Sequence, residues 1–194
     1  QVENISETLE DMRNEIIDDL VTDNENSMHF KVKLKKRFSN RFKISFGSEY
    51  FMTDFNEDYT PNNGLKLTYG FNNNILASFA ETDIFFSKNL ATKIGIRAEN
   101  SELLNEFTIS PRVSLAYKAG KNSQFSLAYG QFYQNPKNEY LKFSQDFKAE
   151  NTSHLIANYQ ATKQGQIFRI EAYYKNYSDL VKHNNNTPIY TSNF

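Results

Sequence analysis

Residues 106–118, EFTISPRVSLAYK, alternate between two kinds of residue over their whole length. Apolar or aromatic side chains, from Phe107 through Ile109 to Tyr117, occupy one parity, and polar, charged or small side chains occupy the other. Successive side chains of a β-strand point to opposite faces, so this pattern predicts a strand with one apolar and one polar face. The fold then depends on whether the apolar face packs on a protein core or faces lipid.

The composition of the 194-residue chain fits strands joined by polar turns. The chain has 17 Phe and 12 Tyr, only 7 Gly and 4 Pro, no Cys, and a formal net charge of −1. The lack of Cys excludes a disulfide framework and a cysteine metal site. No apolar run reaches the roughly 18 residues of a membrane helix, and no signal peptide is visible. A hydrophobic content of 39% still permits a membrane β-barrel, in which only alternate strand residues face lipid.

Residues 1–28 differ from the rest of the chain. They are strongly acidic, and apolar residues from Ile5 to Leu20 recur at helical spacing. The pattern predicts a short amphipathic helix within a loop, either a docking or cation-attracting segment or simply a solvated helix. Residues 29–194 are expected to form a separate unit, the partial wall of a β-barrel.

From residue 29 onward the apolar period is two, which predicts about eight strands of roughly 8–13 residues. Strands of globular sheets cluster near 5–6 residues, whereas crossing a bilayer takes about 9–11. Short turns are expected at 39–40, 87–90, 119–122 and 163–166. Short turns at one rim and longer loops at the other are typical of outer-membrane barrels. To keep this asymmetry, residues 65–71 are assigned to a long loop at 54–74.

The apolar parity carries many Tyr and Phe near the expected strand ends, including Tyr50, Phe107, Tyr117 and Phe125. Tyrosine suits a membrane interface, where the ring meets the headgroups and the hydroxyl stays hydrated. A face packed on a second sheet favours compact Val, Ile and Leu. The sequence therefore predicts an all-β fold, an antiparallel up-and-down transmembrane β-barrel segment. A soluble β-sandwich, such as a carbohydrate-binding module, is the alternative outside the membrane.

Five short motifs follow one another along the chain. They are Glu81 with Asp83, then Gly95, Arg97 and Glu99, then Ser110, Pro111 and Arg112, then Tyr129, Gly130, Gln134 and Pro136, and finally Glu171, Tyr173, Tyr174 and Lys175. Each motif alone is weak. In this order they resemble the barrel of TonB-dependent outer-membrane receptors, particularly those of Bacteroidetes type, over about residues 75–181.

The resemblance implies a bacterial outer-membrane barrel of about 22 strands around a plug. This chain would supply about eight of those strands and neither the plug nor the remaining wall. The implied function is active import of a scarce large nutrient. The implied partners are the TonB energy-coupling complex, acting through the plug, outer-membrane lipid, and an unidentified small-molecule, glycan or peptide ligand. A passive or structural outer-membrane barrel (a porin, an adhesin or a secretion-associated barrel) is the alternative.

Charged residues on the polar parity are the first candidate site residues. The set is Glu81, Asp83, Arg97, Glu99, Arg112, Arg169 and Glu171. Facing the lumen, these side chains would contact a plug or ligand, or would only stabilise the wall as cross-strand pairs. Glu81 and Asp83 share one face of a strand, but the neighbouring Arg97 and Arg112 favour an ion-pair network over a catalytic carboxylate pair.

Tyr133, Tyr140 and Phe143 border the long loop at 134–151 and are candidate ligand contacts or loop anchors. The three His residues lie far apart without acidic residues at ligand spacing, so no metal site, cofactor or enzymatic activity is predicted. Residues 31–43, KVKLKKRFSNRFK, hold seven basic residues and no acidic one. Charge alone would permit nucleic-acid binding, but the alternation beside a turn favours the rim of a barrel, and no nucleic-acid partner is expected.

Overall fold

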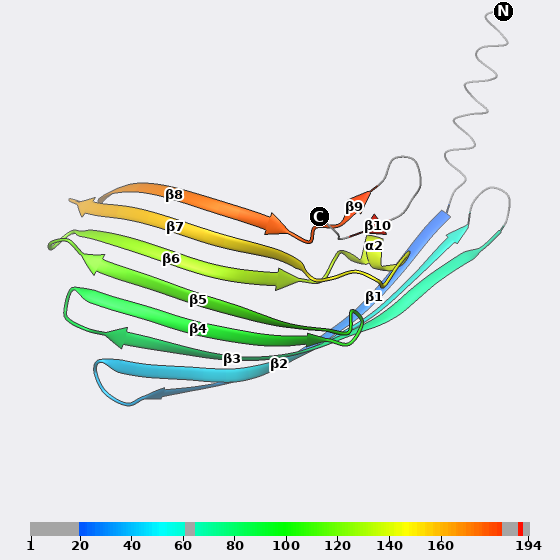
Figure 1. The fold of residues 1–194 in the computed structure, drawn as a ribbon, viewed down its shortest axis with the longest axis horizontal. Coiled ribbons are helices and arrows are strands. Elements are labelled where there is room, and N and C mark those ends of the chain that lie inside the picture. The colour runs from blue at the N-terminus through cyan, green and yellow to red at the C-terminus, as the bar shows by residue number, and fades with distance from the viewer. Residues whose placement is uncertain (1–19, 61–64, 184–189, 192–194) are drawn as a thin grey trace, which may run out of the picture.

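The computed structural model describes residues 20–60, 65–183 and 190–191. Eight strands form one antiparallel sheet, and each strand pairs with its neighbours in sequence (Figure 1). The strands are β1 (Leu20–Arg37), β2 (Phe42–Thr60), β3 (Leu67–Phe85), β4 (Leu90–Ser101), β5 (Glu106–Lys118), β6 (Ser123–Gln134), β7 (Glu150–Lys163) and β8 (Gln166–Ser178). This confirms the predicted all-β, up-and-down architecture.

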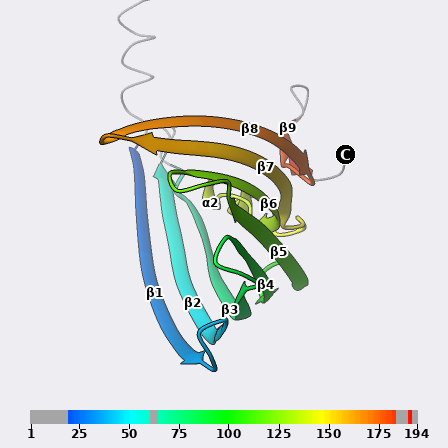
Figure 2. The ribbon, with the colours of Figure 1, turned by 90° about the vertical axis from the view of Figure 1, so that its left-hand side faces the viewer.

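The remaining elements lie at one end of the sheet. The short helix α2 (Asn138–Leu141) interrupts the β6–β7 loop, and β9 (Lys182–His183) pairs with β10 (Tyr190–Thr191). The eight-stranded sheet curves from β1 to β8, and α2 lies inside the curve (Figure 2). No helix within the described residues is long and apolar enough to span a membrane.

The burial of the two faces is the reverse of that in a soluble protein, because the apolar face is exposed and the polar face holds buried side chains. On the apolar face Phe30 is 65% exposed and Phe107 62%, whereas on the polar face Glu49 is only 6% exposed and Ser110 5%. All the residues of β5 that were expected to face lipid are exposed: Phe107, Ile109, Val113, Leu115 and Tyr117. The apolar face therefore does not pack on a protein core within the described residues, as predicted for a membrane wall.

Pro111 lies where the pairing of β5 with β6 ends. The β4–β5 ladder runs past it, with Pro111 opposite Ile96, but the β5–β6 ladder extends only from Arg112 to Lys118. Proline cannot donate to a ladder, so its position next to the end of one ladder is compatible with a long strand. Pairing of β5 with β6 therefore ends beside Pro111.

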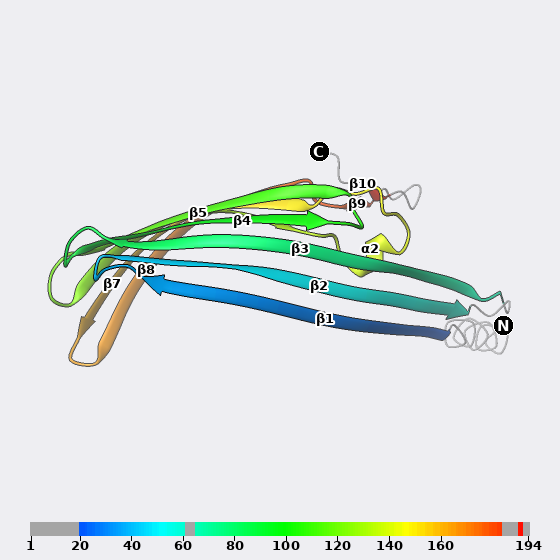
Figure 3. The same cartoon turned by 90° about the horizontal axis from the view of Figure 1, so that it is seen from below.

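Strands β1–β3 are longer than the sequence suggested. Their ladders continue beyond the last β3–β4 pair, Ile75 with Ser101, so the three strands project past the others at the end that carries α2 (Figure 3). The assignment of residues 65–71 to a loop was wrong from residue 67 onward, because β3 begins at Leu67 and continues without interruption to Phe85. The short turns nevertheless stay at one end, because β2 and β3 lengthen together.

The expected acidic segment at 1–28 is also changed by the structure. Residues 20–28 belong to β1 and pair with β2, because pairing with the long β2 satisfies their backbone groups. Residues 1–19, with the predicted helix, lie outside the described residues.

We expect the apolar face to tolerate no cation in its central part. Val113→Arg places a guanidinium on this face near the middle of β5 and is expected to destabilise the barrel by about 2–4 kcal/mol. Equilibrium unfolding of the intact receptor in lipid vesicles measures the change. Ser114→Arg, on the opposite face of the same strand, is the matched control and is expected to cost far less. Equal losses at both positions would contradict the assignment of the faces.

Candidate functional site

Four charged side chains form a network in the middle of the polar face. The Glu49 carboxylate pairs with both the Lys31 ammonium and the Arg97 guanidinium, and its Oε2 lies 2.7 Å from Arg97 Nη1. Arg97 also donates to Glu99 Oε2, from Nε at 3.0 Å and from Nη2 at 2.8 Å. The Glu49 side chain is only 7% exposed and that of Arg97 20%. The network is therefore a partly desolvated cluster rather than a set of surface pairs.

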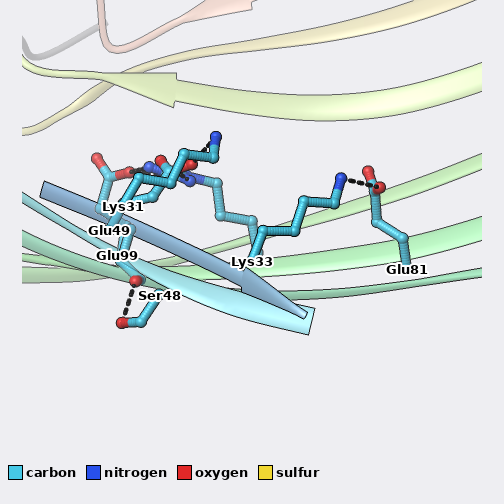
Figure 4. Close-up of polar contacts among 8 residues, drawn as sticks. Lys31, Lys33, Ser48, Glu49, Glu81 and Glu99 are labelled. Carbon is cyan, nitrogen blue, oxygen red and sulfur yellow. Dashed lines mark hydrogen bonds and ion pairs between the residues drawn. The ribbon is translucent and has the colours of Figure 1, made fainter. Parts of the chain in front are cut away.

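Figure 4 shows how alternation builds this face. The side chains of Lys31, Lys33, Glu49, Glu81 and Glu99 rise to the same side of the strands, whereas Ser48 points away from them. Ser48 Oγ instead donates to the Ala77 carbonyl at 2.8 Å. Adjacent residues of one strand thus serve opposite faces, as the strand period requires.

A small residue opens the space that the network needs. Ala77 pairs in register with Glu49 on one side and Glu99 on the other, and it is completely buried. A larger side chain there would occupy the path along which Arg97, on β4, reaches across β3 to Glu49, on β2. The contact between Arg97 and Glu49 therefore depends on the small, uncharged side chain of Ala77.

An aromatic ring separates the network from the next charges. Phe79 lies beside Gly47, where a Cβ would approach its Cζ to 2.8 Å. The ammonium groups of Lys31 and Lys33 lie 5.5 Å and 5.6 Å from the centre of the Phe79 ring, within cation–π range. Lys33 Nζ also lies 3.8 Å from Glu81 Oε2. The ring thus supports two cations that face the same side of the sheet.

Arg112 lies between two glycines, Gly95 on β4 and Gly130 on β6. Its guanidinium lies 5.0 Å from the centre of the Phe132 ring, and Phe132 packs so closely over Gly130 that a Cβ there would come within 2.9 Å of the ring. With Arg97, Arg112 and Gly95 line a hollow of about 140 Å³ on the polar face. The glycines leave room for long side chains to lie along the sheet.

The structure connects some of the predicted charged residues and separates others. Arg97 and Glu99 join one cluster, but Glu81 pairs with Lys33 and Asp83 with Lys93 at 3.2 Å. Glu81 and Asp83 thus take part in ion pairs, but with lysines rather than with Arg97 or Arg112, because the strand register places the lysines closer.

Arg169 and Glu171 lie apart from this network, on β8. Arg169 donates to Gln160 Oε1 at 2.7 Å, and Glu171 accepts from Asn158 Nδ2 at 3.3 Å. Lys31, Lys33 and Glu49 were not among the predicted site residues. The alternation of the sequence places these three residues on the polar face. Which residue each of them contacts depends on the register of the strands.

The β6–β7 loop folds onto the polar face of the projecting strands. Leu141, 1% exposed, and Phe147, 4% exposed, pack with Phe55 of β2 and Phe71 of β3, and the last two rings stack 5.2 Å apart. Leu103 and Leu104 of the β4–β5 turn pack against this cluster. A small hydrophobic core thus forms at the loop end of the sheet, inside its curve.

Polar contacts fasten the same loop to several strands. Lys142 Nζ lies 2.6 Å and 2.9 Å from the two Glu57 carboxylate oxygens. Asn135 Nδ2 donates to Ser101 Oγ at 2.9 Å, and the Ala149 N–H donates to Glu106 Oε2 at 2.5 Å. The loop is held from β2 across to β5. The signal for this packing in the sequence is the presence of Leu141 and Phe147 within a largely polar loop.

The three aromatic residues predicted for the loop occupy different environments. Phe143 is half exposed and meets Tyr69 edge to face at 5.4 Å, with Lys142 Nζ 5.0 Å from the Phe143 ring centre. Tyr140 packs against the loop core. Tyr133 lies on the apolar parity of β6 with Tyr129, and its hydroxyl accepts from Gln131 Nε2 at 2.9 Å. Phe143 and Tyr140 therefore lie in the loop itself, and Tyr133 does not.

The chemistry of the polar face is electrostatic. Within the described residues no group of three or more His, Asp or Glu side chains is placed to hold a metal ion. The carboxylates of Glu49, Glu81, Asp83 and Glu99 are paired with Lys or Arg side chains rather than arranged as a nucleophile and a base. The arrangement suits contact with a charged or polar surface that fills the curve of the sheet.

The model of one family, described as "TonB dependent receptor-like, beta-barrel", matches residues 6–193. No curated protein matches the chain. A variant of the ferric enterobactin receptor from Pseudomonas aeruginosa has a similar structure, with 14% identity, a TM-score of 0.68, and coverage of 84% of this chain and 28% of that one.

Two further solved structures are similar. For the outer-membrane transporter YddB from Escherichia coli the identity is 17% and the TM-score 0.69, with coverage of 89% of this chain and 29% of that one. For the siderophore receptor PirA from Acinetobacter baumannii the identity is 13% and the TM-score 0.69, with coverage of 87% and 31%. This chain thus spans less than a third of each. At such identities the likeness concerns the fold alone.

We expect Glu49 and Arg97 to be energetically coupled. In a double-mutant cycle with Glu49→Gln and Arg97→Gln, the coupling free energy is expected to be about 1–3 kcal/mol, because both groups are largely desolvated. Reversible unfolding of the intact receptor measures it. The exposed pair of Asp58 and Lys66, 2.8 Å apart, is the control, with an expected coupling below about 1 kcal/mol. Equal coupling in both pairs would refute the distinction.

The loop core is expected to depend on Leu141. Leu141→Ala leaves a cavity beside Phe147 and is expected to destabilise loop docking by about 2–5 kcal/mol. Hydrogen exchange of the backbone amides at 135–149 measures this local opening. Gln145→Ala, an exposed change in the same loop, is expected to leave exchange unaltered. Unchanged protection in Leu141→Ala would show that the loop is held by its polar contacts alone.

Proposed function

This chain belongs to the TonB-dependent receptor-like β-barrel family, and from this membership we propose that it is part of the wall of an outer-membrane transporter. The transporter imports a scarce, large nutrient with energy that the TonB coupling complex supplies through a plug domain. The members of the family are outer-membrane proteins, so the exposed apolar face lies against lipid. Transport, ligand and partners belong to the whole receptor, of which this chain is one part.

The partly desolvated charge network on the polar face is the observation that supports this proposal. A passive pore filled with water needs no partly desolvated cluster such as Glu49, Arg97 and Glu99, because water hydrates the charges of its wall. A plug domain excludes that water and offers its own polar groups. We infer that the network holds the wall in shape where it meets the plug. The remaining predicted lumenal residues, Glu81, Asp83, Arg112, Arg169 and Glu171, then contact plug or ligand.

The docked β6–β7 loop supports a ligand-binding role at the loop end of the sheet, away from the short turns. Phe143 and Tyr69 present aromatic rings at the loop end, where long loops face the exterior in such barrels. Rings of this kind stack on planar or apolar parts of ligands. We infer that Phe143 contacts the incoming ligand and that Tyr140 anchors the loop. A small molecule, a glycan or a peptide fits this description.

Import is expected to require the TonB complex. In a strain that lacks the receptor gene, uptake of one member of a labelled panel (ferric siderophores, cobalamin, oligosaccharides and peptides) is expected to fall to background. Restoring the gene recovers uptake only in cells with TonB and a proton-motive force, whereas surface binding persists without them. Uptake that survives the loss of TonB would identify a passive barrel and overturn the proposal.

A further inference from the structure

Exposed cations gather at the end of the sheet where the four hairpins turn. Lys36 and Arg41 flank the β1–β2 turn, and Lys88, Lys121 and Lys163 lie in or beside the other three. All five residues are exposed, and none forms an ion pair with a carboxylate of the described residues. The segments 36–43, 86–90, 118–124 and 162–167 contain no Asp or Glu. These four segments of the short-turn end therefore carry only positive charge.

The opposite end of the same strands is rich in carboxylates. There the acidic residues include Glu25, Asp54, Asp58, Glu102, Glu106 and Glu150. The hairpins lie together at one end in Figure 1, so the separation of charge follows the strand axis. The formal net charge of −1 does not show this separation of charge between the two ends of the strands. A rim that only has to stay hydrated would not require it.

Aromatic side chains lie at the same level as the cations. Phe125 and Tyr159, on the apolar face near the short turns, have ring centres 4.6 Å apart. Phe38 lies 5.7 Å from Phe42, and Lys36 Nζ lies 5.0 Å from the centre of the Phe38 ring. Aromatic rings at this depth mark the boundary between hydrocarbon and headgroups. The cations of the short-turn end thus lie at headgroup level.

We propose that the short-turn end is a binding surface for anionic phospholipid headgroups. Lys36 and Lys163 lie on the parity of the apolar face, with Ile44 opposite Lys36 in register and Tyr159 on the parity of Lys163. Their ammonium groups therefore emerge on the lipid side of the wall. Lys88 and Lys121, in exposed turns, extend the same belt. Phosphate groups of the headgroups supply the negative charge that these cations lack within the protein.

The distribution of the cations favours lipid over an acidic protein segment. The five residues are spread over four successive hairpins around the curve of the sheet (Figure 2). A peptide would engage neighbouring cations gathered on one side of the wall, whereas annular lipid surrounds the whole rim. Phospholipid also lies beside these residues in any membrane-embedded state of the barrel, whether or not it transports.

The preference for anionic lipid is measured on the intact receptor in phosphatidylcholine vesicles. Spin-labelled phosphatidylglycerol and spin-labelled phosphatidylcholine report the relative association of each lipid with the protein. A cation near an anionic surface raises association by up to about fivefold. We expect Lys88→Gln with Lys121→Gln to lower the preference for phosphatidylglycerol by about threefold or more. High salt is expected to weaken the preference of the unchanged receptor through screening.

A double variant at the other end is the control. Lys66→Gln with Lys137→Gln removes the same charge from exposed residues at the loop end, and the lipid preference is expected to stay unchanged. Heat-modifiable migration in gels verifies that both variants are folded. A wild-type receptor without preference, or equal preferences in the two double variants, would overturn the proposal. Unchanged lipid preference together with lost TonB-dependent uptake would assign the cations to a protein partner instead. The lipid measurement needs no transported ligand, so its outcome is separate from that of the uptake experiment.

Discussion

The structure depends on how a single sheet satisfies the hydrogen bonds of its backbone. Every strand between β1 and β8 is hydrogen-bonded to a neighbour on each side, so no backbone group within these ladders needs water. Lipid can then cover one face directly, since it supplies no hydrogen bonds. What distinguishes the two faces is only the parity of each side chain. The unbroken alternation of residues 106–118 is one instance of this constraint, and the same alternation produces the charge network on the other face.

The polar face has to stabilise its own charges. It is concave, so its side chains crowd one another, and Glu49 is largely removed from water. Pairing one carboxylate with two cations offsets that desolvation. The small residues Ala77, Gly47 and Gly95 are then as necessary as the charged ones. They give the long side chains of Arg97 and Glu81, and the ring of Phe79, room to lie along the sheet rather than project from it.

Alternation and turn length were enough to predict the architecture, the exposed apolar face and the placement of the short turns. They failed at the ends of strands. The segments at 20–28 and 65–71 contain Asp, Asn and Gly, which are poor strand formers, but pairing along the long β2 overrides that preference. Residue parity also identified Arg97, Glu99 and Glu81 as members of one face. It could not identify their partners, because a cross-strand contact depends on register and the register comes from the whole set of hairpins.

The loop at 135–149 shows why its role was harder to predict than its existence. A polar segment between two strands reads as a mobile exterior loop, whereas here Leu141 and Phe147 supply the apolar half of a core whose other half, Phe55 and Phe71, comes from strands far away in sequence. That core exists only because β2 and β3 project beyond β4. Lengthening these strands therefore creates the surface on which the loop docks. A movement of the loop toward a ligand must separate Lys142 from Glu57 and expose the two apolar side chains, but it leaves the deeper network around Glu49 intact. The contacts that dock the loop and those of the central network are therefore separate sets.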